Sequence, residues 1–393
     1  MLAAVASIAT DRAPVTTERV SELAGFEALR QEWDELLQRS NSACVFLTWE
    51  WLFTWWKHLS EDRHLSILAI RRGRELIAIA PLCLRPRSLS RARPLPVIEF
   101  LGSGFVGSDY LDVIVRKGDE AEAREALTAH LGSHDLSLKL TNVKHGESVA
   151  ASVFTGLSQE GWTVTETQTN SCPFIPLAGV TWDSYLASLS AEHRYTFHRK
   201  SRRLHKDYVV RFEAVRTKEL CSEAIDLLIA QHNLRWETRG GSDAFHTAGL
   251  IAFHREWIQV ALNRGWLRFY VLRLNEKPAA CLYGLLYRGT FYFYQSSFDA
   301  AYQQHSVGFI AMGLAIQKAI EEGAEEYDLL HGNETYKSHW SSDTRDLARL
   351  EAFPPSGLGQ FYRRSMQFGR TSREFGRASR AMVHRMTSRG PAA

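Results

Sequence analysis

The sequence predicts an α/β (α+β) protein built from two tandem units of similar fold, in which mixed, mostly antiparallel sheets are flanked by helices. The first observation is that apolar positions alternate between helical and strand spacing along both halves of the 393 residues. The second is that a shift of 202 positions aligns the halves without a gap, so that Trp51 falls on Phe253 and the turn residue Gly73 on Asn275. Such a match indicates an internal duplication.

In the first half, Leu23, Phe26, Leu29 and Trp33 recur at helical spacing, and two apolar runs follow on either side of a turn at Gly73. The same reasoning along the chain gives expected helices at 22–39, 50–59 and 120–131, and expected strands at 65–70, 76–84, 97–101 and 110–115.

The second half repeats this order after a linking segment, 181–206, that is interpreted as two helices, the second of them basic. Strands are expected at 266–274, 279–287, 291–297 and 327–330, with a crossover helix at 308–322. The predicted domains are a flexible lead-in (1–20), an N-terminal unit without a cofactor site (21–175), the linking helices with a C-terminal unit that holds the cofactor (176–355), and a basic tail (356–393).

Composition excludes several classes of protein. With 45% hydrophobic and 23% charged residues the chain is neither disordered nor fibrous. The five cysteines are dispersed and form no CxxC pair, which argues against a disulfide framework and against a metal site. No apolar run is long enough to span a membrane, and we expect a cytoplasmic protein.

The net charge is only +3, but two segments of the chain are strongly basic. Residues 192–207 carry six Arg or Lys against two acids; this segment is a solvated helix face, a dock for a phosphorylated or lipid-linked sugar, or a nucleic-acid contact, although no specific nucleic acid is expected. Residues 363–389 carry eight Arg against one Glu and form either a mobile tail or a peripheral contact with the inner face of an anionic membrane.

The two units differ most where each crossover helix begins. Three acids lie at 119–122 in the first unit and would repel a phosphate, whereas 303–308 in the second unit has no acid and ends in Gly308. Exposed N–H groups and a missing side chain would suit a pyrophosphate. The alternative is that Ser306 only caps the helix and Gly308 only permits close packing.

Three segments of the second half carry a family resemblance: 291–299 (FYFYQSSFD), 306–308 (SVG) and 327–340 (YDLLHGNETYKSHW). Together with 49–51 (WEW), 108–110 (SDY) and 232–236 (HNLRW), they resemble the CelD/BcsL-like acyltransferases of the GNAT superfamily, over most of residues 20–345. The resemblance implies two tandem GNAT units, as in the Fem peptidyltransferases, and acetyl-CoA or another acyl-CoA as donor. The phosphate loop departs from the usual pattern, because the first glycine is displaced and Ala311 does not stand at the second position.

Acyl transfer from a thioester needs a base for the acceptor, a backbone N–H for the oxyanion at about 295–298, and an acid for the leaving sulfur. We assign Glu334 as base or orienting group and Tyr336 as acid, with Asp328 as a third catalytic candidate; Glu334 and Lys337 could instead form a simple ion pair. The candidate cofactor-binding residues are Ser297, Phe298, Gln304, His305, Ser306, Val307 and Gly308. The candidate substrate-binding residues are His232, Arg235, Trp236, Gln295 and Lys337.

The function expected from this resemblance is acyl-CoA-dependent N-acyl transfer, with acetyl as the acyl group, to an amino sugar or related precursor of envelope polysaccharide such as cellulose. O-acylation is a close variant of this reaction. Two further alternatives are a Fem-like transfer from aminoacyl-tRNA and a non-catalytic duplicated binding protein that docks to membrane or nucleic acid through its basic segments.

Overall fold

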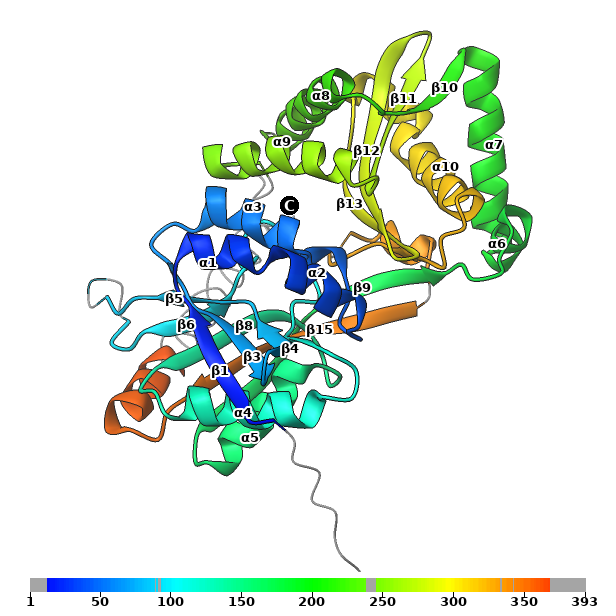
Figure 1. The fold of residues 1–393 in the computed structure, drawn as a ribbon. Coiled ribbons are helices and arrows are strands. Elements are labelled where there is room, and N and C mark those ends of the chain that lie inside the picture. The colour runs from blue at the N-terminus through cyan, green and yellow to red at the C-terminus, as the bar shows by residue number, and fades with distance from the viewer. Residues whose placement is uncertain are drawn as a thin grey trace, which may run out of the picture.

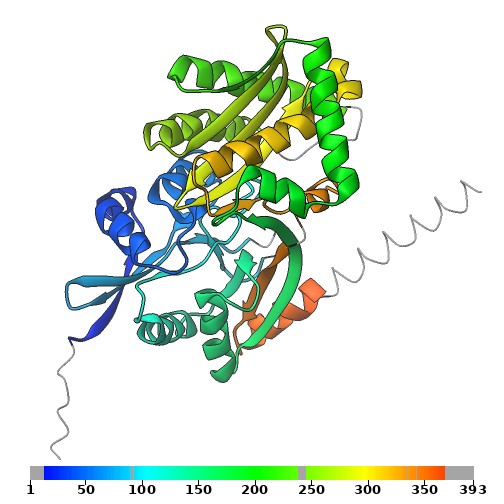
Figure 2. The same cartoon turned by 90° about the vertical axis from the view of Figure 1, so that its right-hand side faces the viewer.

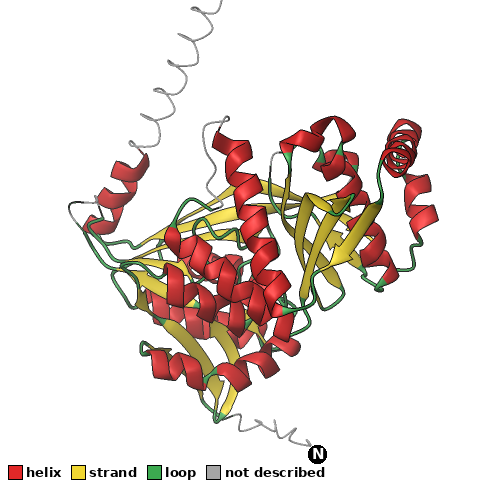
Figure 3. Ribbon diagram, turned by 90° about the horizontal axis from the view of Figure 1, so that it is seen from above, coloured by secondary structure: helices red, strands yellow, loops and turns green. Residues whose placement is uncertain are grey.

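The computed structural model describes residues 13–88, 90, 93–237, 245–332, 334–341 and 343–367, without the side chains of 235–237. Its two α/β halves lie one above the other in Figure 1, with the first half below and the second above. Seen from above, the strands run through both halves and helices flank them, which confirms the predicted fold class (Figure 3).

The first half begins earlier than expected. Residues Val15–Val20, assigned to a flexible lead-in, form strand β1 and pair antiparallel with β3. The helices of this half are α1 (Leu23–Ala28), α2 (Arg30–Gln38), α3 (Trp49–Leu59), α4 (Glu120–Gly132) and α5 (Val149–Gln159). Its further strands are β2 (His64–Leu65), β3 (Ile67–Arg72), β4 (Glu75–Ala80), β5 (Leu82–Arg85), β6 (Val97–Phe100), β7 (Ile114–Val115), β8 (Ser137–Lys144) and β9 (Thr163–Pro176).

The second half opens with the two expected linking helices. They are α6 (Trp182–Ser188) and α7 (Ala191–Asp207). The later helices are α8 (Lys218–Glu237), α9 (Ala248–Asn263) and α10 (Val307–Glu321), and the strands are β10 (Val210–Ala214), β11 (Leu267–Leu274), β12 (Lys277–Tyr287), β13 (Thr290–Phe298), β14 (Glu326–Asp328) and β15 (Asp343–Phe353). Residues 357–367 of the expected tail are helical, and 368–393 lie outside the described residues.

The two halves exchange strands. β15, close to the end of the described chain, lies between β8 and β9 of the first half, while the last residues of β9 pair with β14 of the second half. Among the described residues the result is one eleven-stranded sheet that runs through both halves, beside a separate four-stranded sheet of β1, β3, β4 and β7. The halves are therefore joined by backbone hydrogen bonds as well as by side chains.

The repeat predicted at a shift of 202 positions agrees with the observed elements, since α3 corresponds to α9, β3 to β11 and β4 to β12. The equivalent helices α3 and α9 pack against each other. At their contact Trp51 meets Phe253, its counterpart in the repeat, edge to face with ring centroids 4.9 Å apart. A continuous apolar core therefore joins the two halves at equivalent positions.

Helix α7, the basic linking helix, lies beside α10 in both Figure 1 and Figure 2. The close approach depends on Gly313 of α10, because a Cβ there would lie 2.2 Å from the ring of Phe197 on α7. This packing brings the basic helix to the N-terminal end of α10, which is where the sequence predicts the phosphate site.

Candidate active site

A cleft forms where β13 and β14 part. The two strands pair in parallel as far as Tyr292 and Asp328, and beyond that point no pairing joins them in the described chain. A cavity of about 410 Å³ lies there. Its walls are the continuations of both strands, residues 104–107 of the first half, and part of the segment 329–337.

A β-bulge shapes the β13 wall of this cavity. Tyr283 pairs with Gln295 and Gly284 with Phe293, so Tyr294 is an extra residue that faces no partner on β12. The Tyr294 hydroxyl donates a hydrogen bond to the main-chain oxygen of Val106, which ties the bulge to the first half. Gln295, a predicted substrate-binding residue, lines the cavity.

Asp109 of the first half and His331 of the second form an acid–imidazole pair at this cavity. The carboxylate of Asp109 is fully buried, and its Oδ1 lies 2.6 Å from Nδ1 of His331. Its Oδ2 accepts a hydrogen bond of 2.9 Å from the main-chain N–H of His331. With Nδ1 held by the carboxylate, Nε2 is the ring nitrogen left for a ligand, and His331 lines the cavity.

In this pair the imidazole of His331 can act as a general base, and the carboxylate of Asp109 is placed to orient it. The hydrogen bond and the charge of Asp109 raise the pKa of His331 above its ordinary value. Sequence reasoning placed both residues inside matched motifs but assigned neither a role. They are 222 positions apart, and nothing local in the sequence indicates that the two segments meet.

The segment 334–337, where catalytic residues were expected, lies at the same cavity. Glu334 and Tyr336 both line it. Lys337 is buried, and its Nζ donates to the main-chain oxygens of Leu330 and His331 at 3.3 and 2.9 Å, while Oε2 of Glu334 lies 3.2 Å away. The amine of Lys337 therefore holds the loop that carries His331, and the ion pair considered as the alternative for Glu334 is present.

Asp328, the third catalytic candidate, is fully buried behind the cavity wall. It accepts a hydrogen bond of 2.7 Å from the Tyr110 hydroxyl and another of 2.7 Å from the main-chain N–H of Leu330. Leu330 has a left-handed backbone with φ of 55°. Burial raises the pKa of Asp328 to about 7. These bonds fix the turn that precedes His331, so the geometry favours a positioning role for Asp328.

The N-terminus of α10 has the features expected of a phosphate cradle. Its first turn carries no acid, and Ser306, which precedes the helix, has a left-handed backbone with φ of 55°. Nζ of Lys200 on α7 lies 2.8 Å from Oγ of Ser306, which adds a cation that sequence reasoning did not assign. A Cβ at Gly308 would lie 3.3 Å from the ring of Phe298, so any larger residue would crowd the first turn of the helix. Main-chain N–H groups, a helix dipole and a lysine together suit an anionic phosphate.

The other predicted cofactor residues have different surroundings. His305 accepts or donates a hydrogen bond of 3.1 Å with the Tyr208 hydroxyl. Gln304 and Val307 lie in the same turn, and Val307 is buried. The side chain of Ser297 is buried on the face of β13 toward α8, where its hydroxyl donates to Gln231 at 2.9 Å.

The predicted acceptor helix contacts residues that line the cavity. His232 on α8 is buried, and its ring packs edge to face against Phe245, which lines the cavity. The side chains of Arg235 and Trp236 lie outside the described residues. His254 on α9 also lines the cavity, and complete burial lowers its pKa to about 3, so it is neutral at physiological pH.

Comparison with known proteins connects this geometry to a family. Residues 191–338 match the family model described as an acetyltransferase (GNAT) domain. Over these residues the fold is that of a GNAT domain. The match includes α7, α10, β13, β14 and His331, whereas Asp109 lies outside it.

Solved structures share the fold across both halves. FemX superposes with a TM-score of 0.55 at 12% identity, covering 85% of this chain and 96% of that one. A conserved protein of unknown function from Bacteroides thetaiotaomicron gives a TM-score of 0.53 at 13% identity, covering 86% and 99%. At these identities the likeness concerns the fold alone. No curated protein matches the chain.

Within the described ranges, no three His, Cys, Asp or Glu side chains lie together in a group that could hold a metal ion. None of the described helices combines the length and the apolar character that crossing a membrane requires.

Proposed function

We propose that this protein is an acyl-CoA-dependent N-acyltransferase whose general base is His331. The observation that carries the proposal is the Asp109–His331 pair at the cavity where β13 and β14 part. An imidazole whose Nδ1 is held by a buried carboxylate can accept a proton at Nε2 from an attacking amine.

An acyl-CoA would supply an acyl group activated as a thioester. The residues present fit its phosphates, because the acid-free first turn of α10 with Gly308 and Lys200 offers N–H groups and a cation. Acyl transfer forms a C–N bond and breaks a C–S bond. As the amine nitrogen of the acceptor attacks the acyl carbon, its proton passes to Nε2 of His331, and Tyr336 supplies a proton to the departing sulfur.

The acceptor proposed is an amino sugar or a related precursor of envelope polysaccharide. The cavity combines aromatic walls with polar groups, and Lys337 is its single Lys or Arg among the described lining residues. Because the amine of Lys337 is bonded within its own loop, the reacting end of the acceptor meets Glu334 and His331 rather than a free cation. This environment suits an amine on a hydroxylated ring better than a phosphate. The narrower relation to CelD/BcsL-like enzymes stays a prediction.

The experiment has two parts. Acetyl-CoA is titrated into the protein by calorimetry, together with Gly308→Glu, which adds a carboxylate at the cradle, and with Glu325→Gln as a distant surface control. Acetyl transfer to glucosamine and other amino sugars is then measured for the native chain and for His331→Gln.

We expect saturable acetyl-CoA binding that Gly308→Glu abolishes, and a rate for His331→Gln lowered about 10²- to 10⁴-fold at nearly unchanged acetyl-CoA affinity. Failure of the folded native protein to bind acetyl-CoA would overturn the proposal. It would direct attention to aminoacyl-tRNA as the donor or to a binding role without catalysis.

A further inference from the structure

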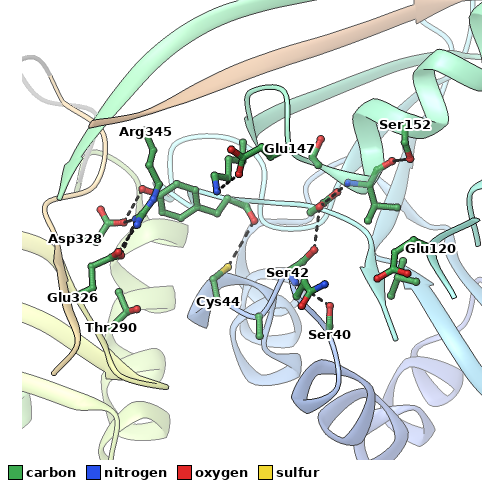
Figure 4. A pocket seen from close by; sticks show the side chains of 18 of the residues that line it. Ser40, Ser42, Cys44, Glu120, Glu147, Ser152, Thr290, Glu326, Asp328 and Arg345 are labelled. Atoms are coloured by element: carbon green, nitrogen blue, oxygen red, sulfur yellow. Dashed lines mark hydrogen bonds and ion pairs between the residues drawn. The ribbon is translucent and has the colours of Figure 1, made fainter. Parts of the chain in front are cut away.

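A second cavity, of about 730 Å³, lies between the two halves and on the far side of the Tyr110–Asp328 hydrogen bond from the cavity of His331. Figure 4 shows it extending from Thr290, Glu326 and Arg345 of the second half to Glu120 and Ser152 of the first. Its volume is typical of a site for a small organic ligand.

This cavity is the counterpart, in the first half, of the cleft that holds the active site in the second. In the second half the strand–helix–strand crossover is β13–α10–β14, and the cleft opens where its two strands part. In the first half the crossover is β7–α4–β8, and its two strands belong to different sheets. The cavity lies between them, lined by Val115 of β7, Glu120 of α4 and Lys144 of β8.

The two clefts differ in the charge of the helix N-terminus that borders them. The first turn of α10 has no acid, whereas the first turn of α4 carries Glu120 and Glu122. Helix α5 also begins at this cavity, but Asp112 already accepts hydrogen bonds from its first N–H groups, at Val149 and Ala150, at 3.0 and 2.8 Å. Neither helix N-terminus is therefore available to a phosphate.

The lining is instead acidic and rich in hydroxyl groups. Five carboxylates face two cations, and both cations are paired within the protein, Lys144 with Glu147 at 2.5 Å and Arg345 with Glu326 at 2.7 Å. The neutral lining side chains include one amide and several hydroxyls, at Asn41, Ser40, Ser42, Ser148, Ser152 and Thr290. The hydroxyls and the amide can exchange hydrogen bonds with a ligand that has many hydroxyl groups. The carboxylates outnumber the cations, so the lining also favours a ligand that carries an ammonium group.

We propose that this cleft is a second ligand site, which binds a polyhydroxylated amine such as an amino-sugar unit of a saccharide. The ammonium group would lie near Glu120 and Glu147 at the first-half end, with hydroxyl groups toward Ser152 and Thr290. The inference does not depend on the proposed function, because it concerns binding in the absence of any acyl donor.

The test is calorimetric titration with the trimer of glucosamine, which has free amines, and with the trimer of N-acetylglucosamine, which is neutral. Ser152→Trp fills the cleft, and the double variant Glu120→Gln/Glu147→Gln removes two of its five carboxylates without changing its shape. Glu125→Gln, an exposed carboxylate on the same helix α4, is the matched control. His331→Trp fills the catalytic cavity instead.

We expect the amine trimer to bind the native protein and His331→Trp, and to bind about tenfold more weakly to Ser152→Trp and to the double variant. The neutral trimer should bind about tenfold more weakly than the amine trimer, and Glu125→Gln should behave as native. The inference is overturned if the native protein does not bind the amine trimer, if both trimers bind equally, or if binding is lost in His331→Trp and kept in Ser152→Trp.

Circular dichroism of every variant checks that it is folded. Acetyl-CoA titration separates the two proposals, because the cleft variants keep acetyl-CoA binding if the proposed function holds and this inference alone fails.

Discussion

Replacing Asp109 by asparagine tests the proposed base most directly. In the native protein the two carboxylate oxygens accept separate hydrogen bonds from the ring and from the main chain of His331. Asparagine has one oxygen, so its amide NH₂ group must face one of these two donors. The substitution keeps the volume of the side chain and removes both the negative charge and one acceptor.

The expected magnitude follows from those two bonds. A hydrogen bond to a charged group contributes about 1.5–3 kcal/mol, and about 1.4 kcal/mol corresponds to one pKa unit. Because Asp109 raises the pKa of His331, its loss lowers that pKa, and the acidic limb of the rate–pH profile should move down by about one to two pH units. At the optimum the rate should fall about 10²- to 10⁴-fold, since Nε2 no longer has a fixed protonation state.

Stability gives an independent measure with a defined sign. A histidine whose pKa is raised by folding stabilises the protein below its unfolded-state pKa, with an ordinary value of 6.5, and this contribution is lost as the pH rises through the folded-state pKa. The difference in unfolding free energy between native protein and Asp109→Asn should therefore be largest below pH 6.5 and smaller in alkali.

The measurements are acetyl transfer from pH 5 to about 9 and urea unfolding at both ends of that range. Asp112→Asn is the matched control, because Asp112 is another buried aspartate, three positions away, that caps α5 and does not contact His331. It should lower stability and leave the acidic limb in place. An acidic limb that does not move in Asp109→Asn, in a folded protein with measurable activity, would refute the assignment of His331 as the base.

Three other substitutions have definite expectations. Lys200→Ala removes the cation beside the α10 N-terminus and should weaken acetyl-CoA binding about fivefold by calorimetry, whereas Arg203→Ala, exposed on the same helix, should change it little. Lys337→Met leaves two loop carbonyls without their donor and should cost about 1–3 kcal/mol in urea unfolding; unchanged stability would contradict the role given to this amine. Gly313→Ala should destabilise by about 1–3 kcal/mol because its Cβ meets the Phe197 ring, and adding Phe197→Leu should recover part of that loss.

Local patterns predicted most of the secondary structure and the repeat. The helices around Trp51 and Phe253 and the hairpins after them were recognised because apolar spacing reflects which face of an element is buried, and that information is local. The same reasoning placed the crossover helix and the acid-free turn at Gly308 correctly, because a helix start depends on a few neighbouring residues.

The features that were missed depend on contacts between distant segments. Nothing in the residues of β15 indicates that it pairs between β8 and β9, because the spacing of apolar residues within a segment does not say which strands will be its partners. Lys337 was expected at a substrate because a lysine usually reaches solvent; in the structure the turn after β14 presents two carbonyls to its amine. β1 was missed because its six residues are mostly polar, and they pair at a sheet edge where only Val20 among them is buried.

The two halves contribute different groups to the candidate site, and contacts between distant segments bring these groups together. The second half supplies the proposed phosphate cradle, the parted strands and His331, and the family match lies entirely within it. The first half, whose own crossover helix begins with acids, supplies the buried carboxylate that orients His331 and the tyrosine hydroxyl that holds Asp328 at the preceding turn. Because β15 and β9 join strands of both halves in one sheet, these groups are held in place by backbone pairing. In the proposed mechanism the first unit therefore contributes to the site by orienting the base, even though its own helix is unsuited to a phosphate.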